Sequence, residues 1–188
     1  MFQEERIRQA IRDILEAVGE DPGREGLRGT PQRVADMLRE VLCGLQEDPR
    51  TFLAQGFSAE GPQGLVLVRH IPFYSLCEHH LLPFFGHAHI GYIPRERIVG
   101  ASKLVRAFEA LARRPQLQER LTNQMADALY EALHPRGVFV VVSAEHLCMS
   151  MRGVQKPGAR LVTQALRGEE TRSPERFREF LTLLRDDV

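Results

Sequence analysis

The chain has 188 residues, of which 43% are hydrophobic and 27% charged, and its 25 basic residues balance its 25 acidic residues. This composition is that of a globular protein with a sizeable core, and zero formal charge excludes a global electrostatic footprint for nucleic acid. No apolar run reaches the roughly 20 residues of a membrane span, and the N-terminus is too charged for a signal peptide. We therefore expect a cytoplasmic protein that binds neither nucleic acid nor a membrane.

The first 60 residues have the pattern of a helical region. Apolar residues recur at helical spacing across residues 3–18, and Gly19 ends that segment. Thr30 is expected to cap a second helix, with Pro31 at its first position. The turn-forming stretch SAEGPQG then separates this region from the rest of the chain. We predict an N-terminal helical region at residues 1–60 and a second domain at residues 61–188.

The second domain begins with two predicted strands. Residues 64–74 and 86–94 are rich in Val, Ile, Phe and Tyr, which favours strands joined across the stretch Cys77–His80. That stretch places a thiol, a carboxylate and two imidazoles side by side. Polar groups at this density are costly to bury unless a partner satisfies them. The connection between the two strands is therefore a candidate functional site.

The rest of the domain alternates helices and strands. A helix is expected from residue 102 to about residue 114, and Pro115 interrupts it and starts another. Residues 138–153 predict a long strand, residues 160–166 a shorter one, and Ser173 begins a last helix. Paired strands that alternate with paired helices favour an α+β fold, in which helices cover one face of an antiparallel sheet.

Cysteine and histidine residues point to a metal site. The three cysteines are too few for a disulfide scaffold, and we interpret Cys43, in an apolar helical stretch, as a core thiol. Cys77 and His80 have the Cys-x-x-His spacing with which one turn can supply two ligands to an ion. Cys148, from a distant strand, would be a third ligand. Three protein ligands with an open fourth position are typical of catalytic zinc, which thiolates favour over magnesium or calcium.

The predicted long strand gives Cys148 its neighbours. Side chains alternate between the two faces of a strand, so His146, Cys148 and Arg152 should share one polar face. Leu147, Met149 and Met151 would then lie on a mostly apolar core face. A closed structural zinc site, with His79 or His146 as the fourth ligand, remains an alternative that spacing does not exclude.

Four stretches together resemble GTP cyclohydrolase I in order and spacing: GLRGTPQRVA, CEHHLLPFFGHAHIGYIP, VGASKLVRAFEALARRPQLQERLTNQ and HLCMSMRGVQK. The resemblance covers about residues 20–185. It implies a tunnelling fold, in which subunits join their sheets into a barrel, usually as a homodecamer with active sites between subunits. It also implies hydrolysis of GTP to 7,8-dihydroneopterin triphosphate and formate, at the entry to folate or tetrahydrobiopterin synthesis.

The resemblance also implies a role for each site residue. The zinc ligands would be Cys77, His80 and Cys148, which agrees with the spacing argument. His79 and His146 would be the proton-transfer pair, and Glu119, with Gln118 beside it, would recognise guanine. Ser102, Lys103, Arg106 and Arg152 would surround the ribose and the triphosphate, where arginine offers forked contacts and lysine a point charge.

Two positions depart from the family pattern. Ala101 stands where a leucine is usual, which would loosen the wall of the base pocket, and Leu161 stands where a threonine is common, which would lower the affinity for phosphate. Two other functions fit the same residues. One is a deazaguanine reductase of the same superfamily, with a cysteine nucleophile and a nicotinamide cofactor. The other is a zinc-stabilised binding or regulatory module that has no turnover.

Overall fold

The computed structural model describes residues 2–61 and 64–185, and the chain divides into two compact units, Met1–Cys43 and Gly44–Val188. This structural boundary precedes the boundary predicted at residue 60. The assignment of residues 1–60 to a helical region and of residues 61–188 to a catalytic domain stays a prediction.

The first unit is a pair of helices, α1 (Glu4–Ala17) and α2 (Thr30–Val41), as the sequence predicts. Gln32 links them by donating from Nε2 to Glu4 Oε1 at 2.9 Å. The predicted cap at Thr30 is wrong by one residue, because Gly29 occupies the N-cap position and no side chain caps the helix. The Thr30 hydroxyl instead accepts a hydrogen bond from Arg33 at 3.2 Å.

Short elements that the sequence did not predict open the second unit. A 3-10 turn, η1 (Cys43–Gln46), crosses the boundary, and α3 (Pro49–Leu53) follows. Asp48 caps α3, because its side chain accepts from the backbone N–H of Arg50 at 3.0 Å. A two-residue strand, β1 (Phe57–Ser58), then pairs antiparallel with β4 (Arg97–Ile98).

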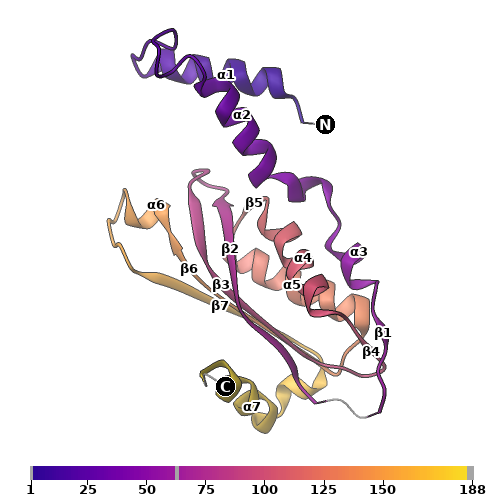
Figure 1. Ribbon diagram of the computed structural model, residues 1–188. Coiled ribbons are helices and arrows are strands. Elements are labelled where there is room, and N and C mark those ends of the chain that lie inside the picture. The colour runs from indigo at the N-terminus through magenta and orange to yellow at the C-terminus, as the bar shows by residue number, and fades with distance from the viewer. Residues whose placement is uncertain (1, 62–63, 186–188) are drawn as a thin grey trace. The chain divides into compact units, whose positions relative to one another are not determined.

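The second unit is built on a curled sheet with the strand order β5-β2-β3-β6-β7 in the part of the chain that the structure describes (Figure 1). Neighbouring pairs among β2, β3, β6 and β7 are antiparallel, whereas β5 pairs with β2 in parallel. The α+β class is confirmed, and the short parallel strand makes the sheet mixed. The strand bounds are β2 (Val66–Cys77), β3 (Pro83–Ile93), β5 (Pro115–Gln116), β6 (Gly137–His146) and β7 (Arg160–Arg167).

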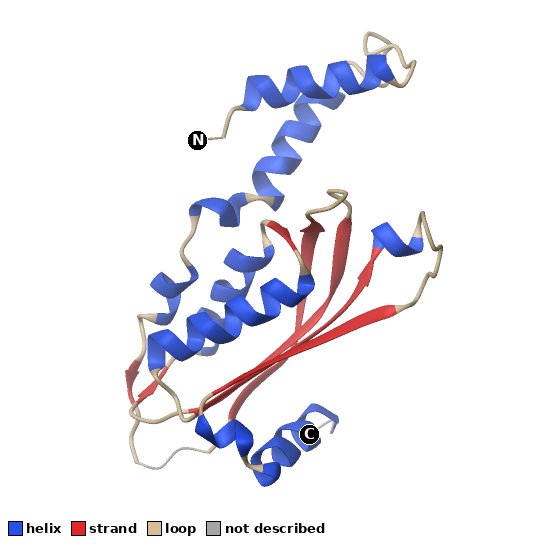
Figure 2. Ribbon diagram, turned by 180° about the vertical axis from the view of Figure 1, so that it is seen from behind, coloured by secondary structure: helices blue, strands red, loops and turns tan. Residues whose placement is uncertain are grey.

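Two helices, α4 (Ala101–Ala112) and α5 (Gln118–Leu133), cover one face of the sheet, as predicted (Figure 2). The side chains that α5 directs at the core recur at helical spacing and are almost fully buried: Leu121, Met125, Leu129 and Leu133. They pack against the alternate residues of β6 that point to the same face, Val138, Val140, Val142 and Ala144, all of which are fully buried. His146 continues this row at the end of β6, so the core face of the strand leads directly to the candidate site.

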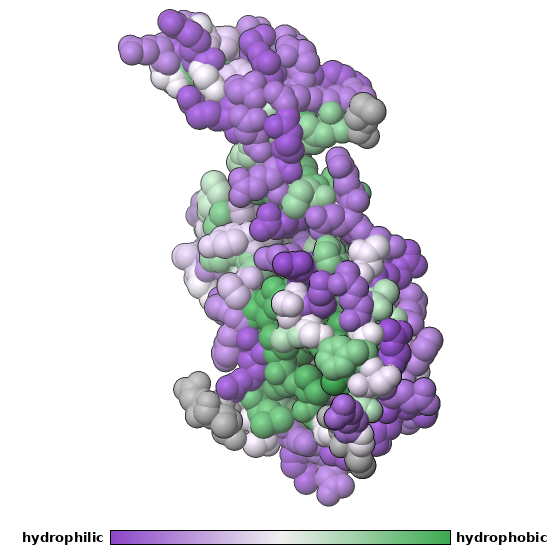
Figure 3. Space-filling model, turned by 45° about the vertical axis from the view of Figure 1, so that its right-hand side comes forward, coloured by the Kyte–Doolittle hydropathy of each residue, from purple (hydrophilic) through white to green (hydrophobic). Residues whose placement is uncertain are grey.

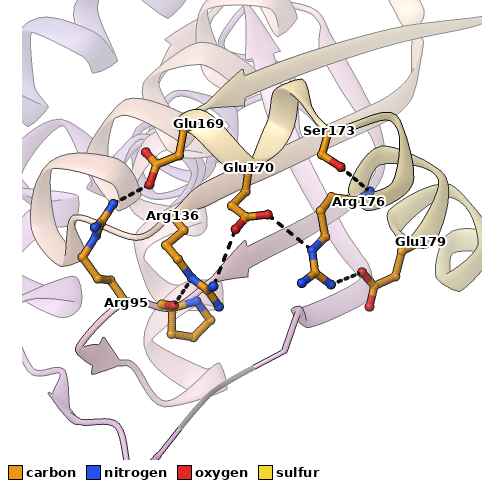
Figure 4. Close-up of polar contacts among 8 residues, drawn as sticks. Arg95, Arg136, Glu169, Glu170, Ser173, Arg176 and Glu179 are labelled. Carbon is orange, nitrogen blue, oxygen red and sulfur yellow. Dashed lines mark hydrogen bonds and ion pairs between the residues drawn. The ribbon is translucent and has the colours of Figure 1, made fainter.

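The opposite face of the sheet is partly covered by the last helix, α7 (Pro174–Arg185), which begins after Ser173 as predicted. Phe180 of α7 is fully buried and stacks on Phe139 of β6, with ring centroids 4.9 Å apart. Figure 4 shows the polar contacts that fix this corner. Glu170, in the turn η2 (Glu169–Arg172), pairs with Arg136 at 3.5 Å and with Arg176 at 3.4 Å.

Two predicted elements differ in the structure. Pro115 does not start a helix: it lies in β5, and α5 begins at Gln118. The long strand predicted to residue 153 ends at His146, and a single helical turn, α6 (Leu147–Ser150), follows. The expected apolar face of Leu147, Met149 and Met151 is therefore not a core face, and Met149 and Met151 are 41% and 61% exposed.

The surface of the two units differs in character on the side that Figure 3 draws. Hydrophobic residues gather over the sheet unit, whereas the N-terminal helices show mainly hydrophilic residues. None of the helices in residues 2–61 and 64–185 is long and apolar enough to cross a membrane.

Candidate metal centre

The predicted connection between two strands is a tight turn from the end of β2 to the start of β3. Cys77 closes β2, and its carbonyl accepts the backbone N–H groups of His80 at 3.3 Å and Leu81 at 2.8 Å. Its own N–H donates to the carbonyl of Leu82 at 2.9 Å. Leu81 has a φ of 53°, a left-handed conformation that a leucine adopts only when its surroundings impose it. The turn therefore holds Cys77 and His80 at fixed positions.

The structure brings the three predicted ligands together. One ligand atom from each of Cys77, His80 and Cys148 lies within 4.8 Å of the other two. The sulfur atoms of Cys77 and Cys148 are 3.9 Å apart. Cys77 is buried, Cys148 half-buried and His80 exposed, so the group lies at the boundary between core and solvent. Two thiols and an imidazole in this arrangement fit the donor set of a zinc ion with an open position.

The electrostatics of the thiols also fit a cation. Burial raises the pKa of the Cys148 thiol, and the neighbouring Cys77 thiol raises it further. Two thiolates this close repel each other unless a positive charge lies between them. A metal ion would reverse this effect and would release protons on binding, because the thiolate is the form that ligates.

Cys148 reaches the group by a route that the sequence did not predict. It lies on the turn α6, not on a continuing strand, so the alternation argument does not describe it. The backbone N–H of Met151 donates to the carbonyl of Leu147 at 3.1 Å, which closes this turn. The turn folds back toward β3, and the side chain of Cys148 packs against the main core beside Cys77.

His146 is held by a ring contact and a hydrogen bond. Its ring stacks on Phe84 of β3, with centroids 4.5 Å apart and planes 3° apart. Its Nε2 lies 2.9 Å from Oε1 of Gln118, and the side chain is 8% exposed. Burial lowers the pKa of His146, and the negative charge of Glu119 opposes that effect. His146 is therefore a buried imidazole two residues before Cys148, with a carboxylate near enough to influence its pKa.

The two predicted guanine readers lie in the first turn of α5 but differ in exposure. Gln118 is fully buried and its side chain hydrogen-bonds within the protein, whereas Glu119 is exposed. Glu119 is thus free to meet a ligand. Among the described residues, the Gln118 side chain already has hydrogen-bond partners in β6 and β7.

Two further predicted residues lie next to the thiol group. His79 is exposed, and its ring meets that of His80 edge-on, with centroids 6.2 Å apart. The Arg152 guanidinium donates to Nε2 of His80 at 3.1 Å. A guanidinium cannot share that lone pair with a cation, so metal binding through Nε2 requires this contact to be exchanged.

Ser102, Lys103 and Arg106 all lie on α4. Ser102 and Lys103 lie in its first turn and Arg106 at its middle, whereas the end of α4 leads into β5, where Gln116 pairs with Cys77. Ten residues of helix separate Ser102 from Ala112, which corresponds to about 15 Å. Within one chain, the start of α4 therefore lies about a helix length from the end that leads to Cys77.

One contact escaped prediction. The Glu78 carboxylate, in the turn between the two ligands, forms an ion pair with Arg120 of α5. Arg120 also donates to Gln116 Oε1 at 2.9 Å and to the carbonyl of Pro115 at 3.1 Å. In the sequence Arg120 is one of many arginines, so no pattern distinguishes it. The only hint in the sequence is Glu78 itself, because a carboxylate in a partly buried turn needs a charged or hydrogen-bonding partner.

Comparison with known proteins shows what this chain is related to. The family model described as GTP cyclohydrolase I matches residues 7–185. GTP cyclohydrolase 1 of Geobacillus kaustophilus (strain HTA426) is 59% identical over 181 residues, which cover 96% of this chain and 96% of the relative. GTP cyclohydrolase 1 of Streptococcus thermophilus (strain CNRZ 1066) is 54% identical over 187 residues, which cover 99% and 100%.

A solved structure, that of the archaeosine synthase QueF-Like in the apo form, is a much more distant match. It aligns with a TM-score of 0.43 at 20% identity and covers 58% of this chain and 98% of that chain. The family match and the two close relatives extend over nearly the whole sequence. The chain therefore belongs to the GTP cyclohydrolase I family.

Proposed function

We propose that this chain hydrolyses GTP to 7,8-dihydroneopterin triphosphate and formate, with zinc held by Cys77, His80 and Cys148. The observation that supports it best is the convergence of these three ligand atoms within 4.8 Å in a member of this family. When bound, zinc supplies a Lewis acid that lowers the pKa of coordinated water to about 7. A reducing compartment such as the cytoplasm would keep both thiols available as ligands.

The two histidines have separate proposed roles. Addition of water at carbon 8 of guanine places electron density on nitrogen 7, and His146 would protonate that atom. His79, which is exposed beside His80, would move a proton on the other side of the reacting carbon. Imidazole suits both tasks because its ordinary pKa lies near 6.5. The stack on Phe84 supports the role of His146 because it fixes the plane of the ring.

Glu119 is the proposed reader of the base. Guanine presents two adjacent donors, a ring N–H and the exocyclic amine, and one carboxylate can accept both. The exposed position of Glu119 and its electrostatic effect on His146 support a base held close to the acid that would protonate it. Adenine offers an acceptor where guanine has the ring N–H, so the carboxylate would repel it.

The triphosphate site is proposed to lie between copies of the chain, in a homo-oligomer that we expect to be a decamer. Ser102 and Lys103 lie at the far end of α4 from Cys77 and Arg106 at its middle, which supports their delivery by a neighbouring subunit. Arg152, which contacts His80, would complete the set of cations from the same subunit as the thiols. In the described sheet β7 is a terminal strand, which leaves an edge for pairing.

The departures from the family pattern have different consequences in the structure. Leu161 offers its backbone carbonyl to Gln118 at 3.0 Å, a contact that does not depend on its side chain. Ala101 is exposed at the first position of α4, where its missing bulk would affect only a site formed with a neighbour. We therefore expect a modest effect on GTP affinity and an intact mechanism.

The test is to incubate purified protein of known zinc content with GTP and to measure formate and the pterin chromophore. Both products in equal amounts would support the proposed reaction. A deazaguanine reductase would instead oxidise a nicotinamide cofactor and leave GTP unchanged. A structural zinc module would show no turnover, and chelation of its metal would unfold it.

A further inference from the structure

The side chain of Gln118 lies at the junction of three elements. Its Nε2 lies 3.0 Å from the carbonyl of Val142 in β6, 3.0 Å from the carbonyl of Leu161 in β7, and 3.1 Å from Oγ1 of Thr163. Its Oε1 lies 2.9 Å from Nε2 of His146. Gln118 is fully buried, so water does not compete for these contacts.

These partners determine which way the amide group faces. Backbone carbonyl oxygens can only accept hydrogen bonds, so the two carbonyls of Val142 and Leu161 require the NH₂ end of Gln118. The reverse orientation would place the amide oxygen against both carbonyls, so that three buried acceptors would face one another with no hydrogen between them. The amide oxygen of Gln118 must therefore face His146.

An amide oxygen accepts and cannot donate, so Nε2 of His146 must carry a hydrogen. We propose that Gln118 is a positioning residue that holds His146 as the Nε2–H tautomer and leaves Nδ1 as the ring nitrogen that exchanges protons with the substrate. The assignment of the tautomer rests on the hydrogen bonds alone. The role of His146 in proton transfer rests on the proposed function.

The chemistry follows from this assignment. The neutral ring has a bare Nδ1, so His146 must first take a proton there from solvent and become an imidazolium. When that imidazolium protonates nitrogen 7 of the base, the N–H bond at Nδ1 breaks and its electron pair returns to Nδ1. A new N–H bond forms on the base, and the Nε2 hydrogen stays on the hydrogen bond to Gln118. The stack on Phe84 and the bond to Gln118 together fix both the plane and the rotation of the ring. Gln118 would therefore act on the rate and not on substrate binding, contrary to the role in guanine recognition that the sequence suggested.

A spectrum of the unaltered protein tests the tautomer directly. Zinc-loaded protein labelled with ¹⁵N-histidine would be measured by solid-state nitrogen NMR above pH 8, where a neutral imidazole shows one protonated and one bare nitrogen. The signals of His146 are those missing from the His146→Asn protein. We expect a protonated Nε2 and a bare Nδ1. A proton on Nδ1, or an even mixture of tautomers, would overturn the proposal.

Kinetics of two variants test the consequence. Gln118→Met removes the oxygen that faces His146, and it should lower kcat at least about tenfold and leave KM within about twofold. Thr163→Val is the matched control, because it removes a partner of the same amide without a contact to His146. It should change kcat little. A rise in KM at unchanged kcat for Gln118→Met would mean that Gln118 binds guanine, and the proposal would be wrong.

The two experiments separate this proposal from the proposed function. If the unaltered protein does not turn over GTP, the proposed function fails, and the nitrogen spectrum still decides which tautomer Gln118 selects. If the Met variant does not fold, the spectrum of the unaltered protein remains sufficient to support or overturn the assignment.

Discussion

Glu78 and Arg120 form an ion pair that ties the turn between Cys77 and His80 to the first turn of α5. Arg120 is itself held by Gln116, whose backbone pairs with Cys77. The turn that carries the two proposed zinc ligands, Cys77 and His80, is therefore supported by a contact from α5. Outer contacts of this kind typically contribute about 10–100-fold to metal affinity or activity.

Arg120→Met should weaken zinc binding by about that factor, because the Glu78 carboxylate loses its partner and the turn loses its anchor. The measurement is a zinc titration against a competing chelator. Arg167→Met is the matched control, since Arg167 pairs with Asp127 of the same helix at 2.6 Å but has no contact with the turn. Equal zinc affinity in the two variants would show that the ion pair does not support the site.

Cys148→Ser should lose zinc and activity and keep its fold. Cys148 is one proposed ligand on a single helical turn, whereas the neighbouring strand is held by a fully buried apolar row. A hydroxyl is a much weaker zinc ligand than a thiolate. Metal analysis and circular dichroism on the same sample would test this. Full zinc occupancy in the variant would remove Cys148 from the ligand set.

The variants His146→Ala and His80→Ala should behave differently. His146→Ala should keep its zinc and lose about 10²–10⁴-fold in turnover, the usual contribution of proton transfer. His80→Ala should lose the zinc itself. Zinc content and kcat measured on both proteins decide the matter. If His146→Ala emptied the site, the metal would be a four-ligand structural ion and the proposed mechanism would fail.

Glu119→Ala should lower GTP turnover and reduce discrimination between GTP and inosine triphosphate. Inosine lacks only the exocyclic amine, so it leaves part of the carboxylate unpaired. Sites that pair with substrate donors can reject analogues that lack them by up to about 10⁴–10⁵-fold. The ratio of kcat/KM for the two nucleotides is the quantity to compare. A variant that discriminates as well as the parent would exclude Glu119 as the guanine reader.

The stability of the protein should fall as the pH falls from about 6.5 to about 4, in part because of His89. Burial, with smaller effects from the positive charges of His70, His87 and Arg69, lowers the pKa of His89 to about 4. Above pH 6.5 the ring is neutral in both folded and unfolded protein. Below that pH, His89 is protonated in the unfolded chain but stays neutral in the folded chain. The free energy of unfolding therefore decreases until the pH reaches the pKa of the folded state.

Because His89 is only partly buried, this contribution should be reduced by solvent screening to about 1–2 kcal/mol. Denaturant unfolding at pH 7.5 and pH 4.5 would measure it. His89→Gln cannot titrate, so its free energy of unfolding should fall by less between the two pH values. Equal losses for the variant and the parent would contradict the assignment.

Elements with a long hydrophobic period were predictable from the sequence. The residues of α5 from Leu121 to Leu133 and the strands on either side of Cys77 lie as expected, because their spacing alone encodes which side is buried. The proximity of Cys77 and His80 was predictable for a similar reason, since both belong to one short turn. Local spacing is information that a single sequence carries.

Features that depend on contacts between distant residues could not be predicted from the sequence. Cys148 was placed beside Cys77 and His80 from an incorrect strand, because the four residues of α6 are too few to show a helical period. The role of Gln118 depends on partners at positions 142, 146, 161 and 163, which only the folded sheet brings together. Pro115 was assigned to a helix start because proline favours that position, but pairing with β2 places it in a strand.

The side chains of three consecutive residues at the start of α5 point in different directions. Gln118 contacts His146, Glu119 is exposed, and Arg120 contacts Glu78. Successive helical residues point about 100° apart, so these directions are set by the residue at which the helix begins. Pro115 and Gln116 pair with β2, so Leu117 is the single residue that links β5 to the start of α5. Inserting or deleting one residue there would rotate all three side chains at once, so we expect this linker to tolerate substitution but not a change in length.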